Sequence, residues 1–283
     1  MIKLVITDLD DTLYSWIGFF VPAFYDMVQE LSNILKVPED ELLKQYKAVH
    51  QEFGSVEYPF ATLKLLSVKK IYAGISDEQV KQELNPVFHK FNSTRKRLLK
   101  LYPGVKETLQ FLNESDISIV AYTESAEENG FYRLKKLGVD NFFKEVYVSD
   151  SLYSCSKQFP SSPKTHIVHG KKPNVTVLKE ICSRQCVTEK ETIYIGDSIS
   201  KDMLMAKQAG VTCIWCDFSV ENSRDLYTKL VAISHWKEED FQREQEYKNV
   251  WAKMKYKPDY IMHSFWECRQ IVSEIIEKES DHK

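Results

Sequence analysis

Short apolar segments that alternate with helical patterns are the feature that most constrains the fold of this chain. Six segments are rich in β-branched and aromatic residues and are predicted to be strands: Ile2 to Thr7, Ile117 to Tyr122, Phe142 to Val148, Thr192 to Ile195, Val211 to Trp215 and Tyr260 to Met262. Helical spacing of apolar residues separates most of them, and one helix is expected to end at Gly210. This alternation predicts an α/β fold with a doubly wound parallel sheet.

The segment from residue 16 to residue 100 departs from this alternation. It shows no strand pattern, and its apolar residues recur at helical spacing, for example at Phe24, Val28 and Leu31. We therefore predict two domains. Residues 1–15 and 101–283 form an α/β domain, and residues 16–100 form a helical domain inserted after the first strand.

Composition and charge exclude several classes of protein. The chain is 43% hydrophobic and 28% charged, which is a globular balance, and its net charge of -3 provides no positive field for nucleic acid or anionic membranes. The longest apolar run, residues 16–25, is shorter than the roughly 20 residues that span a bilayer. Aspartates interrupt the apolar N-terminus before it could form a signal peptide. We expect a cytoplasmic protein that acts on a small molecule, and the sequence leaves its oligomeric state open.

Pairs of cysteine and histidine residues suggest metal sites, but their surroundings do not favour one. Cys213-x-x-Cys216 lies in an apolar strand without a second pair, which predicts buried structural thiols. His166-x-x-His169 lies in the long polar connection 151–171, where no carboxylate and no pair of cysteines completes a ligand set. We interpret these histidines as solvated loop residues.

Acidic residues follow two of the predicted strands at the points where the strands end. Asp8-x-Asp10-x-Thr12 comes after the first strand, and Asp197 and Asp202 follow the strand that ends at residue 195. Ligands of open α/β sheets bind at the carboxyl ends of strands, and neighbouring parallel strands bring these ends together. Carboxylate oxygens favour a hard cation such as Mg²⁺. The sequence therefore predicts a magnesium site at this edge of the sheet.

A hydroxyl and an ammonium group complete a possible phosphate site. Thr123 ends another predicted strand, and Lys172 precedes Pro173 at the start of a helical segment. Lys171 and Lys164 are alternatives to Lys172, since all three lie in or next to the same polar connection.

The order of these elements resembles the four motifs of haloacid dehalogenase superfamily phosphatases, and the resemblance covers most of the chain. The helical insert at residues 16–100 is similar to the C1 cap of that superfamily. The matching motifs are Asp8-x-Asp10-x-Thr12, Thr123, Lys172 and Gly196-Asp197 with Asp202.

The resemblance implies a magnesium-dependent hydrolase of phosphoric monoesters. Asp8 would attack phosphorus to form an aspartyl-phosphate, while Asp10 would protonate the leaving alcohol and then activate water. Thr123 and Lys172 would bind the phosphate. The expected substrate is a small phosphorylated metabolite, such as a sugar phosphate, phosphoglycolate or a nucleotide.

The same resemblance implies a ligand set for the metal ion. Mg²⁺ would be held by a carboxylate oxygen of Asp8, the backbone carbonyl of Asp10 and the side chain of Asp197. Asp202 would orient Lys172 or a metal-bound water.

Three other functions remain open at this stage. A phosphomutase would use the same residues, and a signalling receiver module also phosphorylates an aspartate on a doubly wound sheet. A non-catalytic protein of the same fold is the third, because a fold does not guarantee an activity. A dehalogenase is disfavoured, since it would have no need of the acid and base that Asp10 supplies.

Overall fold

The structure is a computed structural model that describes residues 1–150, 163–219 and 224–280. It divides into two compact units. One comprises Met1–Ser15, Lys100–Glu221 and Glu244–Lys283, and the other comprises Trp16–Leu99 and Asn222–Arg243. The first unit is α/β and the second is helical.

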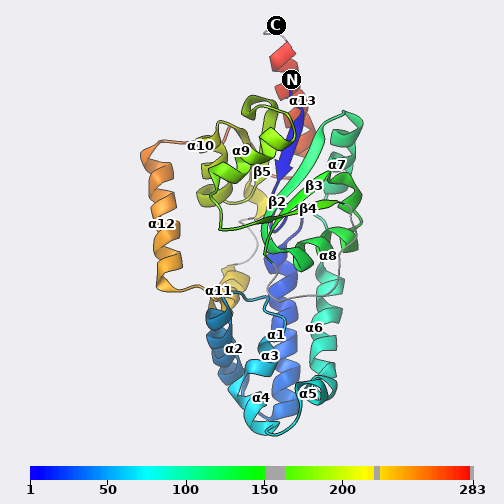
Figure 1. The fold of residues 1–283 in the computed structure, drawn as a ribbon, viewed down its shortest axis with the longest axis vertical. Coiled ribbons are helices and arrows are strands. Elements are labelled where there is room, and N and C mark those ends of the chain that lie inside the picture. The colour runs from blue at the N-terminus through cyan, green and yellow to red at the C-terminus, as the bar shows by residue number, and fades with distance from the viewer. Residues whose placement is uncertain (151–162, 220–223, 281–283) are drawn as a thin grey trace. The chain divides into compact units, whose positions relative to one another are not determined.

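The α/β unit is built on a sheet whose described strands number seven, all parallel, in the order β4-β3-β2-β1-β5-β6-β7 (Figure 1). The predicted doubly wound parallel sheet is confirmed. The chain leaves the central strand β1 toward β2 on one side and later returns to β5 on its other side, which makes β1 and β5 the switch point of the topology. The strands are β1 (Leu4–Thr7), β2 (Ser118–Ala126), β3 (Glu145–Ser149), β4 (Lys164–Val168), β5 (Thr192–Gly196), β6 (Thr212–Cys216) and β7 (Tyr260–Met262).

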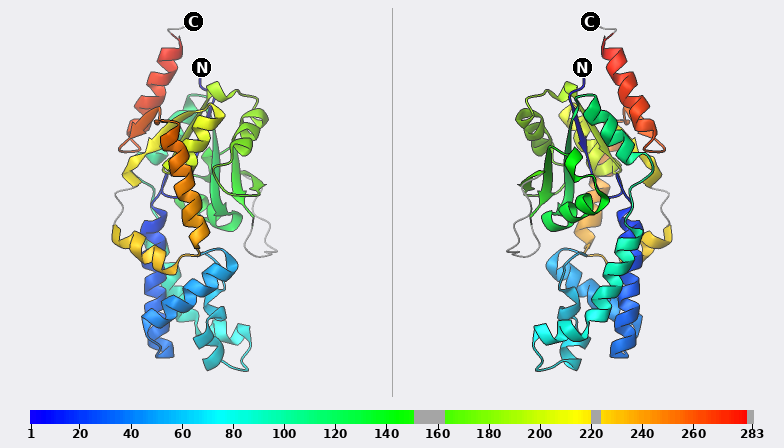
Figure 2. Two further views of the ribbon diagram at one scale, coloured as in Figure 1. Left: turned by 90° about the vertical axis from the view of Figure 1, so that its left-hand side faces the viewer. Right: turned by 90° about the vertical axis from the view of Figure 1, so that its right-hand side faces the viewer.

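Helices lie on both sides of this sheet (Figures 1 and 2). α9 (Val175–Arg184) and α10 (Leu204–Ala209) bury Leu178, Ile181 and Met205 in the main core cluster, together with side chains of β1, β2 and β5. Each fully buried aliphatic side chain of this kind contributes about 1.5–3 kcal/mol. Further helices of this unit are α7 (Val105–Glu114) and α8 (Glu127–Leu137), which pack on β2, and α13 (Glu267–Ser280), which packs on α7. Residues 244–253 of α12 (Glu238–Lys253) also belong to it.

The edge strand β4 was not predicted, and it changes the interpretation of one histidine. His166 lies on β4 opposite Tyr147 of β3, stacks on that ring at 4.6 Å, and places Nε2 3.1 Å from Glu145. The prediction of a solvated loop residue is therefore wrong for His166, whereas His169 follows the strand and is exposed. An edge strand is only partly covered, so polar residues in β4 hid the apolar pattern by which a strand is recognised.

The cysteines of β6 are structural, as predicted. Cys213 and Cys216 are free thiols with no exposed surface, and burial raises the pKa of Cys213 to about 12. Such a thiol stays protonated at neutral pH and reacts slowly. Cys155 lies outside the described residues.

The second unit contains only helices within its described residues. Phe24 of α1 and Tyr46 and His50 of α2 form an aromatic cluster with ring centroids 4.8–5.8 Å apart. No described helix of the chain combines the length and the apolar character needed to cross a membrane. The helices of this unit are α1 (Trp16–Leu35), α2 (Glu39–Phe53), α3 (Ala61–Lys64), α4 (Leu66–Ile71), α5 (Asp77–Glu83), α6 (Asn85–Leu98), α11 (Arg224–Ile233) and the first residues of α12 (Glu238–Lys253).

Residues 222–243 belong to the helical unit, whereas the sequence analysis placed them in the α/β domain. The Tyr25 hydroxyl donates to the Lys229 carbonyl at 3.0 Å, and His50 Nδ1 lies 2.7 Å from the carbonyl of Ile233. Burial lowers the pKa of His50 to about 4, so the ring is neutral and its Nδ1–H donates to that carbonyl. These contacts join segments about 200 residues apart, and the charged sequence of α11 and α12 carries no signal of them.

A glycine at the start of α7 generates the first prediction. Gly104 has φ +90°, and a Cβ at this position would lie 2.8 Å from both the Trp266 ring and the Trp266 backbone nitrogen. We expect Gly104→Ala to lower the free energy of unfolding by more than the roughly 1–2 kcal/mol that the left-handed conformation alone costs. Denaturant unfolding measures this change.

Gly138, at the end of α8, is the matched control. It has φ +67° and nothing within 4 Å of an added Cβ, so Gly138→Ala should show the conformational cost alone. Adding Trp266→Ala to Gly104→Ala should restore little stability, because the backbone nitrogen also blocks the Cβ. Equal losses for the two glycine variants would contradict the prediction.

Candidate active site

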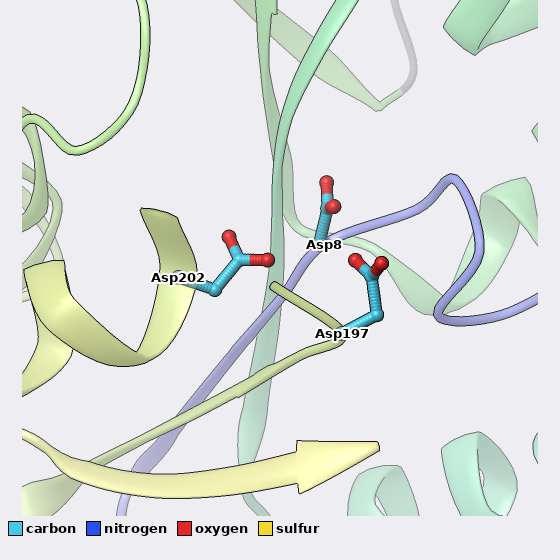
Figure 3. A group of neighbouring side chains, drawn as sticks. All are labelled: Asp8, Asp197 and Asp202. Carbon is cyan, nitrogen blue, oxygen red and sulfur yellow. The ribbon is translucent and has the colours of Figure 1, made fainter. Parts of the chain in front are cut away.

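Three carboxylates meet at the carboxyl ends of β1 and β5. Asp8 follows β1, Asp197 follows β5, and Asp202 lies in the π-helical turn Ile199–Met203. One oxygen from each lies within 4.8 Å of the other two, and Figure 3 shows the three side chains facing a common space. The Asp8 N–H donates to the Ile195 carbonyl at 2.9 Å, so strand pairing itself brings the two acidic segments together.

The ammonium group of Lys172 lies against two of these carboxylates. Its Nζ is 3.0 Å from Oδ1 of Asp8 and 2.9 Å from Oδ1 of Asp202, and the residue is 3% exposed. Lys171 is exposed, and Lys164 on β4 lies 3.9 Å from Glu145. Of the three lysines that the sequence left open, the structure thus brings Lys172 to the carboxylates.

Asp202 is fixed by further donors. The Tyr194 hydroxyl donates to its Oδ1 at 2.8 Å, and the Ser198 N–H donates to its Oδ2 at 3.2 Å. A Cβ at Gly196 would lie 2.6 Å from Cγ of Asp202, so only glycine leaves room for this carboxylate. Gly196 is therefore required for the position of the Asp202 side chain, and it also precedes Asp197 directly.

Burial dominates the electrostatics of the cluster. It raises the pKa of Asp8 well above the ordinary value, and it does the same for Asp197, where the charges of Asp202 and Asp11 add to the effect. Burial alone would lower the pKa of Lys172, but Asp202 and Asp8 outweigh it and raise that pKa. Three carboxylates share one ammonium group, and the cluster keeps an excess of negative charge.

This donor set fits a hard divalent cation. Its side-chain donors are carboxylate oxygens, which suit Mg²⁺, and a cation would offset the buried negative charge that raises these pKa values. Asp8 and Asp197 offer side-chain oxygens, and an oxygen of Asp202 lies within the same distance.

The turn after β1 orients the residues that follow Asp8. Asp11 adopts φ 55°, a left-handed conformation that aspartate tolerates better than most residues. The chain then doubles back, because the N–H groups of Thr12 and Leu13 both donate to the Leu9 carbonyl, at 3.3 and 2.9 Å. Asp10 is thereby held at the strand end, two residues beyond Asp8.

The end of β2 contributes Thr123 and its neighbour Glu124. Thr123 is 1% exposed, and its Oγ1 accepts the Ser125 N–H at 3.1 Å. Glu124 accepts the Lys172 N–H at 2.9 Å and the Lys201 ammonium at 2.5 Å. Burial would raise the pKa of Glu124, but Lys201 outweighs it and the pKa is lowered. Glu124 therefore connects the end of β2 to the segment that carries Lys172.

Asp10 is also held by residues that the sequence analysis missed. Arg133 Nη1 of α8 lies 2.8 and 3.1 Å from its two carboxylate oxygens, and the Ser125 hydroxyl donates to Oδ2 at 2.5 Å. Ser125 lies two residues beyond Thr123, and Arg133 is a charged residue on the buried face of α8, which was the available signal. Residues near the site that were not predicted include Tyr14, Glu124, Ser125, Arg133, Tyr194 and Lys201.

The sheet is doubly wound, acidic residues follow β1 and β5, and the ammonium group of Lys172 contacts two of the carboxylates. This combination defines a protein of the haloacid dehalogenase type. The sequence profile of the haloacid dehalogenase-like hydrolases matches residues 5–216. The chain belongs to this hydrolase family, which confirms the resemblance inferred from the motifs.

Similar proteins include several phosphatases. The chain is 27% identical over 217 residues to the glyceraldehyde 3-phosphate phosphatase of Methanopyrus kandleri, covering 76% of this chain and 83% of that protein. It is 25% identical over 224 residues to the phosphoglycolate phosphatase of Pseudomonas savastanoi pv. phaseolicola, covering 79% and 72%.

Solved structures share the fold. A 2-haloacid dehalogenase from Pseudomonas syringae pv. tomato superposes with a TM-score of 0.57 at 20% identity, covering 97% of this chain and 99% of that chain. A phosphatase of the haloacid dehalogenase type from Thermococcus onnurineus gives 0.55 at 18% identity, covering 96% and 98%.

The electrostatics of the carboxylate cluster generate the second prediction. Because the pKa of Asp197 is higher in the folded state than in the unfolded chain, its charge destabilises the metal-free fold above about pH 4. In a chelator at pH 7 we expect Asp197→Asn to raise the free energy of unfolding by about 1 kcal/mol or more, and Tm by about 2–4 °C. Thermal unfolding in chelator measures both.

The prediction has an internal check and a control. The stability gained by Asp197→Asn should shrink as the pH falls, because Asp197 of the unsubstituted protein then becomes protonated. Asp40→Asn, at a side chain that is 75% exposed on α2, should leave Tm nearly unchanged. A lower Tm for Asp197→Asn in chelator would contradict the electrostatic argument.

Proposed function

We propose that this protein is a magnesium-dependent phosphatase that hydrolyses small phosphomonoesters through an aspartyl-phosphate at Asp8. The observation that carries the proposal is the Lys172 ammonium, 3.0 Å from Asp8 Oδ1, in a buried carboxylate cluster. A carboxylate held beside a fixed cation is suited to attack an anionic phosphoryl group. Similarity to proteins named as phosphatases supports the same activity.

In the first step, a carboxylate oxygen of Asp8 forms a bond to phosphorus while the bond to the leaving alcohol breaks. Lys172 and Thr123 bind phosphoryl oxygens, and Asp202 keeps Lys172 in place. Bound Mg²⁺, held by Asp8, Asp197 and the Asp10 carbonyl, would neutralise phosphoryl charge and align the group with the nucleophile.

Asp10 moves the proton in both steps. It gives a proton to the leaving alcohol oxygen in the first step, and it takes one from the water that attacks the aspartyl-phosphate in the second. The second transfer reverses the first, so phosphate is released and both aspartates return to their starting states. Alkoxide leaving groups need such an acid, which favours phosphatase over dehalogenase chemistry.

The names of two relatives support the proposed substrate class. Glyceraldehyde 3-phosphate and phosphoglycolate, for which two relatives are named, are both small phosphomonoesters. We propose a substrate of this class, and we propose that the helical unit acts as a cap whose side chains select it.

A cytoplasmic location agrees with the free thiols of the described cysteines.

A substrate panel tests the proposed function and provides the third prediction. The purified full chain is incubated with phosphoglycolate, glyceraldehyde 3-phosphate, sugar phosphates, nucleotides and 4-nitrophenyl phosphate, with Mg²⁺ or with chelator. We expect phosphate release from at least one substrate, and its loss in chelator. Asp8→Asn should lower the rate by at least about 10⁴-fold, because it removes the nucleophile of the covalent route.

The alternatives predict different results. Phosphate release no higher than that of Asp8→Asn across the panel would overturn the proposal. An isomerised sugar phosphate in place of free phosphate would identify a phosphomutase, and a phosphoprotein that persists for hours without turnover would indicate a signalling module. Asp40→Asn is the matched control and should keep full activity, since its side chain is exposed on α2.

A further inference from the structure

Arg133 carries a buried charge that the proposed mechanism does not use. The residue lies on α8 and is 3% exposed, in a helix face whose neighbouring buried residues, Phe131 and Leu134, are apolar. Burying a guanidinium is costly unless it is paired and hydrogen-bonded. The hydrogen-bond partners of Arg133 therefore indicate its role.

Those partners lie at the site. Nη1 of Arg133 donates to Oδ1 and Oδ2 of Asp10 at 2.8 and 3.1 Å, and to the Ser125 hydroxyl at 2.7 Å. The Ser125 hydroxyl in turn donates to Oδ2 of Asp10 at 2.5 Å. Asp10, Ser125 and Arg133 thus form a closed triangle of hydrogen bonds between the turn after β1, the end of β2 and α8.

The two sides of this triangle differ in exposure. The Asp10 side chain is 23% exposed, whereas Arg133 is buried, so solvent or substrate reaches the carboxylate from the side away from the guanidinium. A carboxylate on a turn would otherwise sample several rotamers, since no strand pairing restrains a side chain. The buried donors restrict it to one.

We propose that Arg133 is a positioning residue that holds the Asp10 carboxylate in the orientation needed for proton transfer to the leaving group, with Ser125 as the second support. The inference rests on the proposed phosphatase function. It adds two residues that would act on the reaction through Asp10. A proton donor must lie within hydrogen-bond distance of the leaving oxygen, so loss of orientation costs rate more than it costs binding.

The fourth prediction compares leaving groups in Arg133→Met. With an alkyl phosphomonoester hydrolysed by the unsubstituted enzyme, we expect kcat to fall by about 10²-fold while KM changes by less than about 3-fold. With 4-nitrophenyl phosphate, whose leaving group needs little protonation, the first step should survive. Because water activation also uses Asp10, a rapid burst of 4-nitrophenol should precede a slow steady state. Stopped-flow absorbance measures the burst.

Two companion variants separate positioning from folding. Arg133→Lys keeps a cation and should recover part of kcat on the alkyl substrate. Ser125→Ala makes a small change that is expected to fold normally, and it should show a weaker form of the same leaving-group pattern. Lys135→Met, at an exposed position on α8, is the matched control and should leave both substrates unaffected.

A double mutant gives the decisive comparison. If Arg133 acts through Asp10, Arg133→Met should slow an Asp10→Asn enzyme by less than about 2-fold, because coupled residues are not additive. Independent, multiplicative losses would overturn the proposal, as would equal losses on both substrates without a burst. An unsubstituted enzyme that releases no phosphate would overturn the proposed function, whereas an active enzyme with an unchanged leaving-group ratio in Arg133→Met and Ser125→Ala would overturn only this inference.

Discussion

The α/β unit holds three carboxylates close together at the ends of its central strands, and one ammonium group, that of Lys172, contacts two of them. Asp8, Asp197 and Asp202 repel one another in surroundings where burial already disfavours their charged forms. A flexible chain would relieve this by moving them apart. Here Asp8 and Asp197 follow directly after adjacent, hydrogen-bonded strands, and Asp202 is fixed by Tyr194 and Ser198. Strand pairing keeps these like charges close together. A cation bound between them would reduce their repulsion, and this would favour its binding.

The supports of the site come from a second layer of polar residues. Glu124 joins the end of β2 to the segment of Lys172, and Arg133 with Ser125 joins α8 to Asp10. Each contact links elements that the chain connects only through long excursions. Side chains that work on a substrate need fixed positions, and hydrogen bonds to charged groups fix them more firmly than apolar packing does.

Sequence reasoning succeeded where a local pattern carries the information. Apolar strands ending in aspartate placed Asp8 and Asp197 at one edge of the sheet, because parallel pairing leaves few arrangements for such segments. It failed for β4, an edge strand that begins with three consecutive polar residues and is only partly buried. It also failed for residues 222–243, which join the helical unit through bonds such as that between His50 and the Ile233 carbonyl. No spacing in the sequence shows a contact of that kind.

Arg133 and Glu124 show a different limit. Both residue types are common on surfaces, so their presence in a helix or at a strand end carries little information until burial is known. Once burial is known, the inference reverses: a guanidinium that is 3% exposed has to be paired, and its pairing with Asp10 gives it a place in the proposed reaction. The four motifs supply groups that would meet phosphate and metal. The positions of two of these groups, Asp10 and Lys172, depend on charged residues outside the motifs, Arg133 and Glu124.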